Sequence, residues 1–257
     1  MSTNFDEKIA IVTGAGTGLG AAIARTFAAA GALVVVSDVD EAAAEALAKE
    51  LPGSTAIVCD VTRPEEVEAL VARTVETYGS LDVMVPNAGV TGIAPLTEMS
   101  YEEWRRVTAV NLDGVFLSIR YAAPALVASG GGSIVTIASI TATGGAGLIA
   151  HYAAAKAAVV SLTKTAAVEL GPHGVRVNAV LPGYLHTQLV HGAVGAFETA
   201  GGLEQGSLVP AIEAKQGGRL GSVEEVAQSV LFLAGDDSGF CNGSELVIDG
   251  GFVGGLF

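Results

Sequence analysis

Three side chains near the middle of the chain have the types and the spacing for proton transfer. If their segment is helical, Tyr152 and Lys156 lie one turn apart on one face, so a phenol and an ammonium group meet. A neighbouring cation favours the phenolate and moves the tyrosine pKa from about 10 toward neutral pH. Ser139 could then hold a substrate oxygen beside the phenol. The trio suits an alcohol or carbonyl substrate, although a Tyr-x-x-x-Lys pair alone is common in amphipathic helices.

A glycine-rich turn near the start of the chain is typical of a dinucleotide site. The apolar run at 8–13 ends in GAGTGLG at 14–20, after which apolar residues recur at a helical spacing. Such glycines let a pyrophosphate approach the backbone, and the amide groups that begin the next helix meet its charge. The segment therefore predicts a strand, a phosphate-binding turn and a helix.

Asp38 ends the second apolar run, eighteen residues after Gly20. A carboxylate there can bind the two hydroxyls of an adenosine ribose, and it would repel the 2′-phosphate of NADP. The neighbours Thr17, Ser37 and Val39 supply no positive charge that would reverse this preference. The sequence thus predicts NAD as the cofactor. The alternative is a ligand-free turn with Asp38 capping the helix that follows.

Three polar residues further along the chain each allow a ligand-binding or a purely structural role. Asp60 could bind an adenine amino group or cap the helix expected at 64–78, a role for which Thr62 competes. Asn87 stands in a Pro-Asn-Ala-Gly turn that either admits a ribose or is an ordinary turn. Asn111 lies among apolar residues and must be hydrogen-bonded, so it braces the fold or holds a water molecule. The local sequence favours the brace.

The elements that would position these residues alternate between strand and helix. Short apolar runs predict strands at 8–13, 33–38, 56–59, 81–85, 132–138, 175–180 and 245–248. This alternation predicts an α/β fold: a single Rossmann-type doubly wound domain over 1–257, with a seven-stranded, mainly parallel sheet and helices on both faces. The carboxyl edge of such a sheet binds ligands, and it would gather the glycine turn, Asp38, Asn87 and Ser139.

The segment at about 184–219 shows no clear periodicity and predicts a long substrate loop over the site. Its composition favours a hydrophobic substrate such as a cyclic, aromatic or steroid-like alcohol. The apolar and aromatic residues concerned are Tyr184, Leu185, Leu189, Val190, Val194, Phe197, Leu203 and Leu208. Some of these side chains could instead pack on the protein itself.

Composition argues against several other kinds of function. Thirteen basic and twenty-seven acidic residues give a net charge of −14, which argues against nucleic acid or an anionic membrane as a partner. No apolar run approaches the roughly 20 residues of a membrane-spanning helix, and the N-terminus lacks the pattern of a secretory signal. Cys59 and Cys241 have no metal-ligand spacing and fit a reducing compartment. We expect a cytoplasmic protein without a metal site.

The motifs together resemble the short-chain dehydrogenase/reductase family over nearly the whole chain. The pattern Thr-Gly-x-x-x-Gly-x-Gly at 13–20 matches the cofactor loop of that family, and 87–89 matches its central turn. The catalytic set is matched by Asn111, Ser139, Tyr152 and Lys156. The nicotinamide-side segment is matched by Pro182, Gly183 and Thr187. Pro86 departs from the pattern, where the family usually has asparagine, and we leave it out of the site because proline lacks a backbone donor.

The resemblance implies a role for each matched residue. Tyr152 would be the acid/base, Ser139 would hold the reacting oxygen, and Asn111 would hold a water molecule in the proton relay. Lys156 would bind the nicotinamide ribose and lower the pKa of Tyr152. The other cofactor contacts would come from Gly14, Thr17, Gly18, Leu19, Gly20, Asp38, Asp60, Val61, Asn87, Ala88, Gly89, Pro182, Gly183, Leu185 and Thr187.

These features predict an oxidoreductase that transfers a hydride between NAD(H) and a secondary alcohol or ketone. One alternative is a 3-oxoacyl-thioester ketoreductase, which would normally use NADPH, so Asp38 counts against it. Another is a non-catalytic NAD-sensing regulator, against which the intact Ser139, Tyr152 and Lys156 count. The resemblance also implies a homotetramer, and the apolar tail at 250–257 could lie against a neighbouring subunit.

Overall fold

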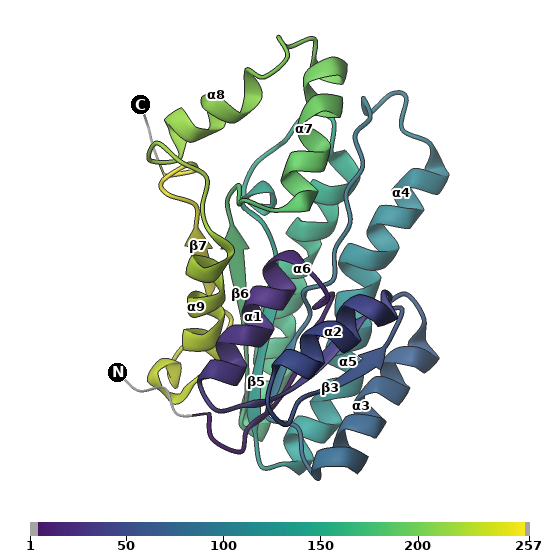
Figure 1. Cartoon of the computed structure of the whole chain (residues 1–257), viewed down its shortest axis with the longest axis vertical. Helices are drawn as coiled ribbons and strands as arrows, with labels where there is room; N and C mark the ends of the chain where they lie inside the picture. The colour runs from purple at the N-terminus through teal and green to yellow at the C-terminus, as the bar shows by residue number, and fades with distance from the viewer. Residues whose placement is uncertain (1–4, 255–257) are drawn as a thin grey trace.

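The computed structural model describes residues 5–254 and contains a seven-stranded sheet with helices on both faces (Figure 1). The strands are β1 (Ile9–Thr13), β2 (Leu33–Asp38), β3 (Thr55–Val58), β4 (Val83–Val85), β5 (Gly132–Ile137), β6 (Val175–Pro182) and β7 (Glu245–Ile248). Their order across the sheet is β3-β2-β1-β4-β5-β6-β7. Every pairing is parallel. The predicted doubly wound fold is confirmed, and the sheet predicted as mainly parallel is parallel throughout.

Two layers of helices bury the sheet. One layer consists of α1 (Gly18–Ala29), α2 (Glu41–Glu50) and α9 (Val223–Ala234). The other consists of α3 (Pro64–Tyr78), α5 (Gly114–Ala128) and α6 (Ala150–Leu170). Side chains of β1 alternate between the layers, with Val12 in the first core and Ile11 in the second. This double burial explains why the strands are continuous apolar runs.

The strand order changes direction between β1 and β4, so the helices that follow these strands cover opposite faces. The carboxyl ends of the two strands therefore leave a crevice between diverging connections. The remaining helices lie toward this edge, at the top of Figure 1: α4 (Tyr101–Thr108), α7 (Gln188–Gly201) and α8 (Leu208–Lys215). In sheets of this topology, ligands bind in this crevice.

The prediction of an irregular loop over 184–219 is wrong, because α7 and α8 occupy most of it. Thr187 caps α7, its hydroxyl oxygen accepting a hydrogen bond from Val190 N at 3.3 Å. The apolar residues that α7 turns toward the crevice, Leu189, Val190, Ala193, Val194 and Phe197, recur at a helical spacing. Gly192 and Gly195 interrupt this pattern and weaken the helical signal in the sequence.

The described part of the C-terminal tail packs on its own chain. The Asp249 carboxylate accepts hydrogen bonds from Gly251 N and Val253 N, each at 2.8 Å. The ring of Phe252 lies 5.3 Å from that of Tyr184, edge to face. The predicted contact of the tail with a neighbouring subunit stays a prediction, and 255–257 lie outside the described residues.

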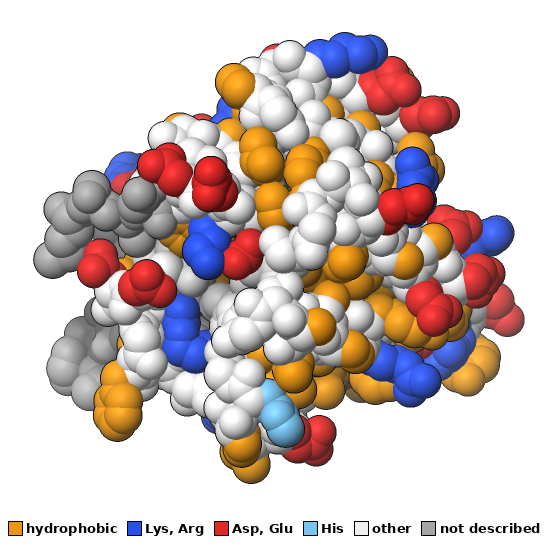
Figure 2. All heavy atoms as spheres, turned by 90° about the horizontal axis from the view of Figure 1, so that it is seen from below, with side chains coloured by type: hydrophobic (Ala, Val, Ile, Leu, Met, Phe, Trp, Pro, Cys, Tyr) orange, Lys and Arg blue, Asp and Glu red, His pale blue; other side chains and the backbone are white. Residues whose placement is uncertain are grey.

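The surface carries charges of both signs. On the face shown in Figure 2, acidic and basic side chains are interspersed and hydrophobic side chains are exposed between them. Across residues 5–254, no helix is long and apolar enough to cross a membrane.

Candidate active site

The glycine turn packs directly against the turn after β4. Gly14 has a φ of +60°, and a Cβ on it would lie 2.7 Å from the Cα of Ala88. A Cβ on Gly20 would collide with the carbonyl oxygen of Gly14 and lie 2.5 Å from Asn87 Nδ2. Asn87 Nδ2 donates to Thr13 O at 2.8 Å and to Gly14 O at 3.0 Å. Asn87 is therefore a brace that closes the two turns on each other, and it also lines the cavity described below.

The N-terminus of α1 opens onto this cavity. In the structure described here, the N-cap Thr17 makes no side-chain cap bond and the first turn holds no acidic residue. Gly18 has a φ of +57° and nothing within 4 Å of a Cβ built on it. The free amide groups and the positive end of the helix dipole therefore suit a pyrophosphate.

Asp38 anchors the glycine turn from the end of β2. Its Oδ2 accepts a hydrogen bond from Gly16 N at 2.8 Å, and its Oδ1 accepts one from Asp40 N at 3.0 Å. The alternative prediction that Asp38 caps the next helix is wrong. Asp40 is the N-cap of α2, its side chain accepting from Ala43 N at 3.0 Å. Asp38 lines the cavity and presents its negative charge there.

Asp60 closes a local turn. Its Oδ1 accepts hydrogen bonds from Thr62 N at 2.9 Å and from Thr62 Oγ1 at 2.7 Å. The predicted capping of α3 by Asp60 or Thr62 is wrong, because the N-cap is Arg63, for which no side-chain cap bond is seen in the described chain. Asp60 and Val61 both line the cavity, as the ligand-binding alternative requires.

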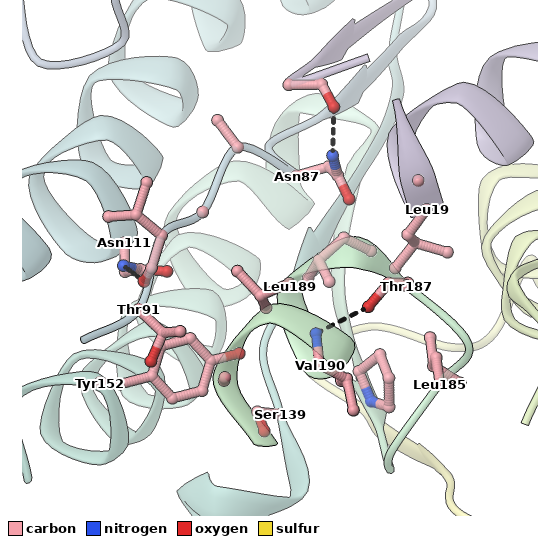
Figure 3. Close-up of a pocket in the computed structure, with 18 of the residues that line it drawn as sticks. Leu19, Asn87, Thr91, Asn111, Ser139, Tyr152, Leu185, Thr187, Leu189 and Val190 are labelled. Atoms are coloured by element: carbon pink, nitrogen blue, oxygen red, sulfur yellow. Dashed lines mark hydrogen bonds between the residues drawn. The ribbon is translucent and has the colours of Figure 1, made fainter. Parts of the chain in front are cut away.

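The three residues predicted to handle the proton all line this cavity, and Figure 3 shows two of them, Tyr152 and Ser139. Lys156 Nζ lies 5.6 Å from the centroid of the Tyr152 ring, one turn away on α6, and donates to Ile137 O at 2.8 Å. Ser139 lies two residues after the end of β5, and its oxygen accepts a hydrogen bond from Thr141 N at 3.2 Å. The hydroxyl hydrogen of Ser139 therefore stays available to a second acceptor.

Burial dominates the titration of this pair. It raises the pKa of Tyr152 to about 12, an effect that a hydrogen bond with Ser139 partly offsets and that the nearby Tyr184 slightly increases. Burial also lowers the pKa of Lys156 to about 8. The pKa of Tyr152 therefore lies above its ordinary value and not below it as expected, because desolvation of the phenolate is the largest effect.

Asn111 lies in a π-helix, Ala109–Asp113, between α4 and α5. Its Nδ2 donates to Val90 O at 2.7 Å and to Val107 O at 2.9 Å, which gives it the bracing role. Its Oδ1 is buried without a hydrogen-bond partner among residues 5–254. A Cβ on Gly89 would lie 2.9 Å from this oxygen and 3.8 Å from Lys156 Nζ. The bracing role is therefore confirmed, and the water-holding role stays a prediction for which the unpartnered carbonyl oxygen is available.

A buried glutamine fixes the backbone of the segment that follows β6. Gln216 is buried and clasps the backbone of Tyr184, accepting from its N at 2.9 Å and donating to its O at 2.7 Å. A Cβ on Gly183 would lie 2.7 Å from Gln216 Oε1, so this close approach requires glycine. The sequence analysis missed Gln216, since a buried glutamine inside an apparently irregular segment gives no motif.

One cavity of about 570 Å³ contains all of the predicted site residues. The apolar residues predicted to face a substrate also line it, apart from Leu203, which is 45% exposed. Lining residues that the sequence analysis did not single out include Thr91, Ile93, Ile149, Gln188, Ala193 and Ile212. The helical period of α7 and α8 could have found the last three, had those helices been recognised.

The fold and the cavity define an oxidoreductase with a Rossmann-type nucleotide site. The family model described as enoyl-(acyl carrier protein) reductase matches residues 14–253. A short-chain type dehydrogenase/reductase from Mycobacterium marinum is 37% identical with a TM-score of 0.86, over 98% of this chain and 97% of that one. The chain belongs to the short-chain dehydrogenase/reductase family, which confirms the resemblance seen in the sequence.

Several relatives are named as alcohol dehydrogenases or as ketone reductases. Cyclohexanol dehydrogenase from Acinetobacter sp. (strain SE19) is 42% identical over 98% of both chains. Cis-4-hydroxycyclohexanecarboxylate dehydrogenase from Sinomonas cyclohexanicum is 41% identical over 98% of this chain and 99% of its own. The 3-oxoacyl-[acyl-carrier-protein] reductase of Thermotoga maritima is 38% identical over 97% and 99%. A gluconate 5-dehydrogenase from Burkholderia cenocepacia J2315, solved with NADP and tartrate, is 32% identical with a TM-score of 0.92 over 99% and 98%.

Proposed function

We propose that the protein is an NAD-dependent dehydrogenase of hydrophobic, cyclic secondary alcohols, working in either direction. The observation that carries this proposal is an apolar wall that shares one cavity with Tyr152 and Ser139. The wall consists of Leu189, Val190, Val194, Phe197, Leu208 and Ile212. Moving a carbon ring from water onto such a wall lowers the free energy. A sugar bound there would bury hydroxyl groups without hydrogen-bond partners. The relatives named for cyclohexane alcohols support the same substrate class.

The residues divide the chemistry among them. A bound nicotinamide supplies the hydride acceptor for alcohol oxidation. We assign to Tyr152 the acceptance of the hydroxyl proton, and to Ser139 a hydrogen bond to the same substrate oxygen. Lys156 supplies positive charge beside the phenol, which offsets part of the cost of forming a buried phenolate. Asn111 Oδ1 is placed to accept a hydrogen bond from water near Lys156, which would connect the phenol to solvent.

The cavity suits a dinucleotide with an unphosphorylated ribose. The open N-terminus of α1 suits the pyrophosphate, and Asp38 suits the two ribose hydroxyls. A 2′-phosphate beside the Asp38 carboxylate would meet like charge. Val39, the exposed neighbour of Asp38 in the cavity wall, offers no compensating cation. We therefore assign NAD, although a structural neighbour was solved with NADP.

A second candidate is reduction of a 3-oxoacyl thioester, because a 3-oxoacyl-[acyl-carrier-protein] reductase is among the relatives. The two candidates differ in cofactor and in substrate shape. Asp38 and the apolar wall from α7 and α8 favour the cyclic alcohol.

The test is NADH formation from NAD at mildly alkaline pH, over secondary alcohols ranging from short aliphatic to cyclohexanol, bicyclic and steroidal compounds. NADP and an acyl-thioester substrate are measured in parallel. We expect the highest kcat/KM with a cyclic alcohol and NAD. A preference for the thioester with NADPH would replace the first candidate with the second, and NAD binding without any turnover would favour a regulator.

We also propose that the enzyme is a homotetramer in the cytoplasm. Phe116 on α5 and Val168 on α6 are large hydrophobic side chains that are 43% and 77% exposed. Exposed apolar side chains on neighbouring helices suit burial against another subunit. Light scattering on the purified protein measures the oligomeric state, and a monomeric mass would overturn this part of the proposal.

A further inference from the structure

His151, the residue before Tyr152, is fully buried at the start of α6. Its Nδ1 accepts a hydrogen bond from the backbone N–H of Tyr152 at 2.9 Å. Within the described structure, the N-cap Ile149 makes no side-chain cap bond and the first turn holds no acidic residue. The imidazole therefore satisfies a first-turn amide group, a task usually performed by a serine or aspartate at the cap.

This bond sets the tautomer of the ring. An acceptor at Nδ1 places the proton of a neutral imidazole on Nε2. Nε2 is buried without a hydrogen-bond partner in the part of the chain that the structure describes, and Glu103 Oε1 faces it from α4 at 3.7 Å. A Cβ on Gly92 would lie 3.2 Å from Nε2 and would collide with Glu103 Oε1. Only glycine at position 92 leaves the imidazole and the carboxylate facing each other.

Glu103 is fixed in turn by Arg106, which also contacts the backbone of a residue that lines the cavity. Arg106 Nε and Nη2 each donate to the Glu103 carboxylate at 2.7 Å. The same Nη2 donates at 2.9 Å to the backbone oxygen of Thr91, a cavity residue (Figure 3). These bonds hold the pKa of Glu103 below its ordinary value, so the carboxylate is charged at neutral pH.

We propose that His151, as its Nε2–H tautomer, is a positioning residue for Tyr152 and is itself oriented by Glu103 and Arg106. The inference rests on the proposed function, in which Tyr152 transfers the proton. Tyr152 is the third residue of α6, so losing the partner of its amide loosens the turn that holds its phenol near Ser139. A misplacement of about 1 Å at a reacting group can cost roughly a hundredfold in rate.

The variants separate the acceptor from the volume of the ring. His151→Asn keeps an acceptor near the place of Nδ1, whereas His151→Phe keeps the volume without one. We expect His151→Phe to lower kcat for cyclohexanol by about tenfold or more, with KM and the Kd for NAD within about threefold. His151→Asn should recover most of that loss. Glu103→Gln and Gly92→Ala should each lower kcat, whereas Glu102→Gln, a change at the exposed neighbour, should not.

The tautomer is measured directly on the wild-type protein by ¹⁵N NMR of labelled histidines, with His151→Asn assigning the signal among the four histidines. We expect a proton on Nε2 and an unprotonated Nδ1. An Nδ1-protonated ring, or an unchanged kcat in His151→Phe, would overturn the inference. Tyr152→Phe separates the proposed function from the positioning role of His151. Full activity of Tyr152→Phe would overturn the proposed function. If Tyr152→Phe is inactive while His151→Phe keeps full activity, only the positioning role is overturned.

Discussion

Burial is the main influence on the two titratable groups at the centre of the site. It raises the pKa of Tyr152 to about 12 and lowers that of Lys156 to about 8, so both shifts favour the uncharged side chain. Formation of a phenolate there depends on whatever offsets desolvation. The described structure offers the hydroxyl of Ser139 and the lysine itself for this task.

The shift of Lys156 predicts how stability changes with pH. The unfolded side chain keeps its proton up to its ordinary pKa of 10.5, whereas the folded one loses it near 8. The unfolded state therefore binds more protons between these values, and this group makes stability rise with pH there, by a few kcal/mol at most, about 1.4 kcal/mol per pKa unit. Lys156→Met should remove the rise from a plot of melting temperature against pH. Lys164→Met, a change at an ion-paired lysine of the same helix that is 56% exposed, should retain it. Parallel curves for wild type and Lys156→Met would contradict the shift.

Asp38 is expected to set the cofactor preference. Asp38→Asn removes the negative charge but keeps an oxygen acceptor for the glycine turn. A charged hydrogen bond contributes about 1.5–3 kcal/mol, so kcat/KM with NAD should fall by about tenfold or more, and the NAD/NADP ratio should fall with it. Asp40→Asn is the matched control, because Asp40 caps α2 and does not line the cavity. An unchanged ratio in Asp38→Asn would show that specificity lies elsewhere.

At the residue scale, motifs located the site well because chemistry fixes their residue types and spacing. The residues expected from the glycine turn, Tyr152 and Lys156 all lie in one cavity. What the sequence did not reveal are contacts that depend on side-chain rotamers. Examples are the hydrogen bond from the Tyr152 amide to His151 and the free oxygen of Asn111. Neither has a spacing rule, since each depends on burial by distant elements.

At the scale of elements, α7 and α8 form the apolar wall and are joined through a buried carboxylate. Glu198, near the end of α7, accepts hydrogen bonds from Gly206 N at 2.9 Å and from Leu208 N at 3.0 Å. These bonds lower the pKa of Glu198, and they fix the connection and the first turn of α8. The wall therefore has a defined shape, which size selection among substrates requires.

Weakening this joint should loosen the wall without touching the nucleotide side. Glu198→Gln removes one acceptor and replaces it with a donor facing backbone N–H groups. We expect a KM for cyclohexanol raised severalfold, an unchanged Kd for NAD, and faster limited proteolysis at 202–207. Glu204→Gln, an exposed change in the same connection, serves as the control. Equal KM and equal cleavage rates in the two variants would rule out this role for Glu198.

The elements themselves show which patterns are informative. All seven strands and the helices that pack on the sheet were predicted, because burial on one or both faces imposes a regular apolar period. The helices α7 and α8 were missed because glycines in α7 and a proline in α8 obscure their helical spacing, and the π-helix around Asn111 has no apolar period of its own. Apolar periodicity therefore identifies a helix less clearly where glycine or proline interrupts it.

At the scale of the whole molecule, one arginine joins the end of α9 to the sheet. Arg176 on β6 is partly buried. Its guanidinium group donates to backbone carbonyls in the last turn of α9 and in the segment that follows the helix. The backbone carbonyls it reaches belong to Leu233, Ala234, Gly235, Ser238 and Cys241. The positive charge there also opposes the negative end of the helix dipole. This role could not be predicted from the sequence, because nearly all of the acceptors are backbone oxygens more than fifty positions away.

Removing this joint should affect stability and leave turnover alone. Arg176→Met leaves several carbonyls without a donor, at a cost of about 3 kcal/mol, which lowers the melting temperature by about 5–10 °C. Arg176 lies at the amino end of β6, whereas the active-site cavity lies at the carboxyl end of that strand. We therefore expect kcat at 25 °C to match that of wild type. Arg120→Met, a change at an exposed arginine on α5, should alter neither. A melting temperature equal to that of wild type in Arg176→Met would contradict this account.

The most direct test of the whole account is the rate of NAD-dependent cyclohexanol oxidation by Tyr152→Phe beside wild type. Loss of the hydroxyl removes the proton acceptor but keeps the ring, so we predict a fall in kcat of about a hundredfold or more. NADH binding, followed by fluorescence, should stay within about threefold, which shows that the nucleotide site is intact. A Tyr152→Phe enzyme that turns over cyclohexanol at the wild-type rate would contradict the central claim.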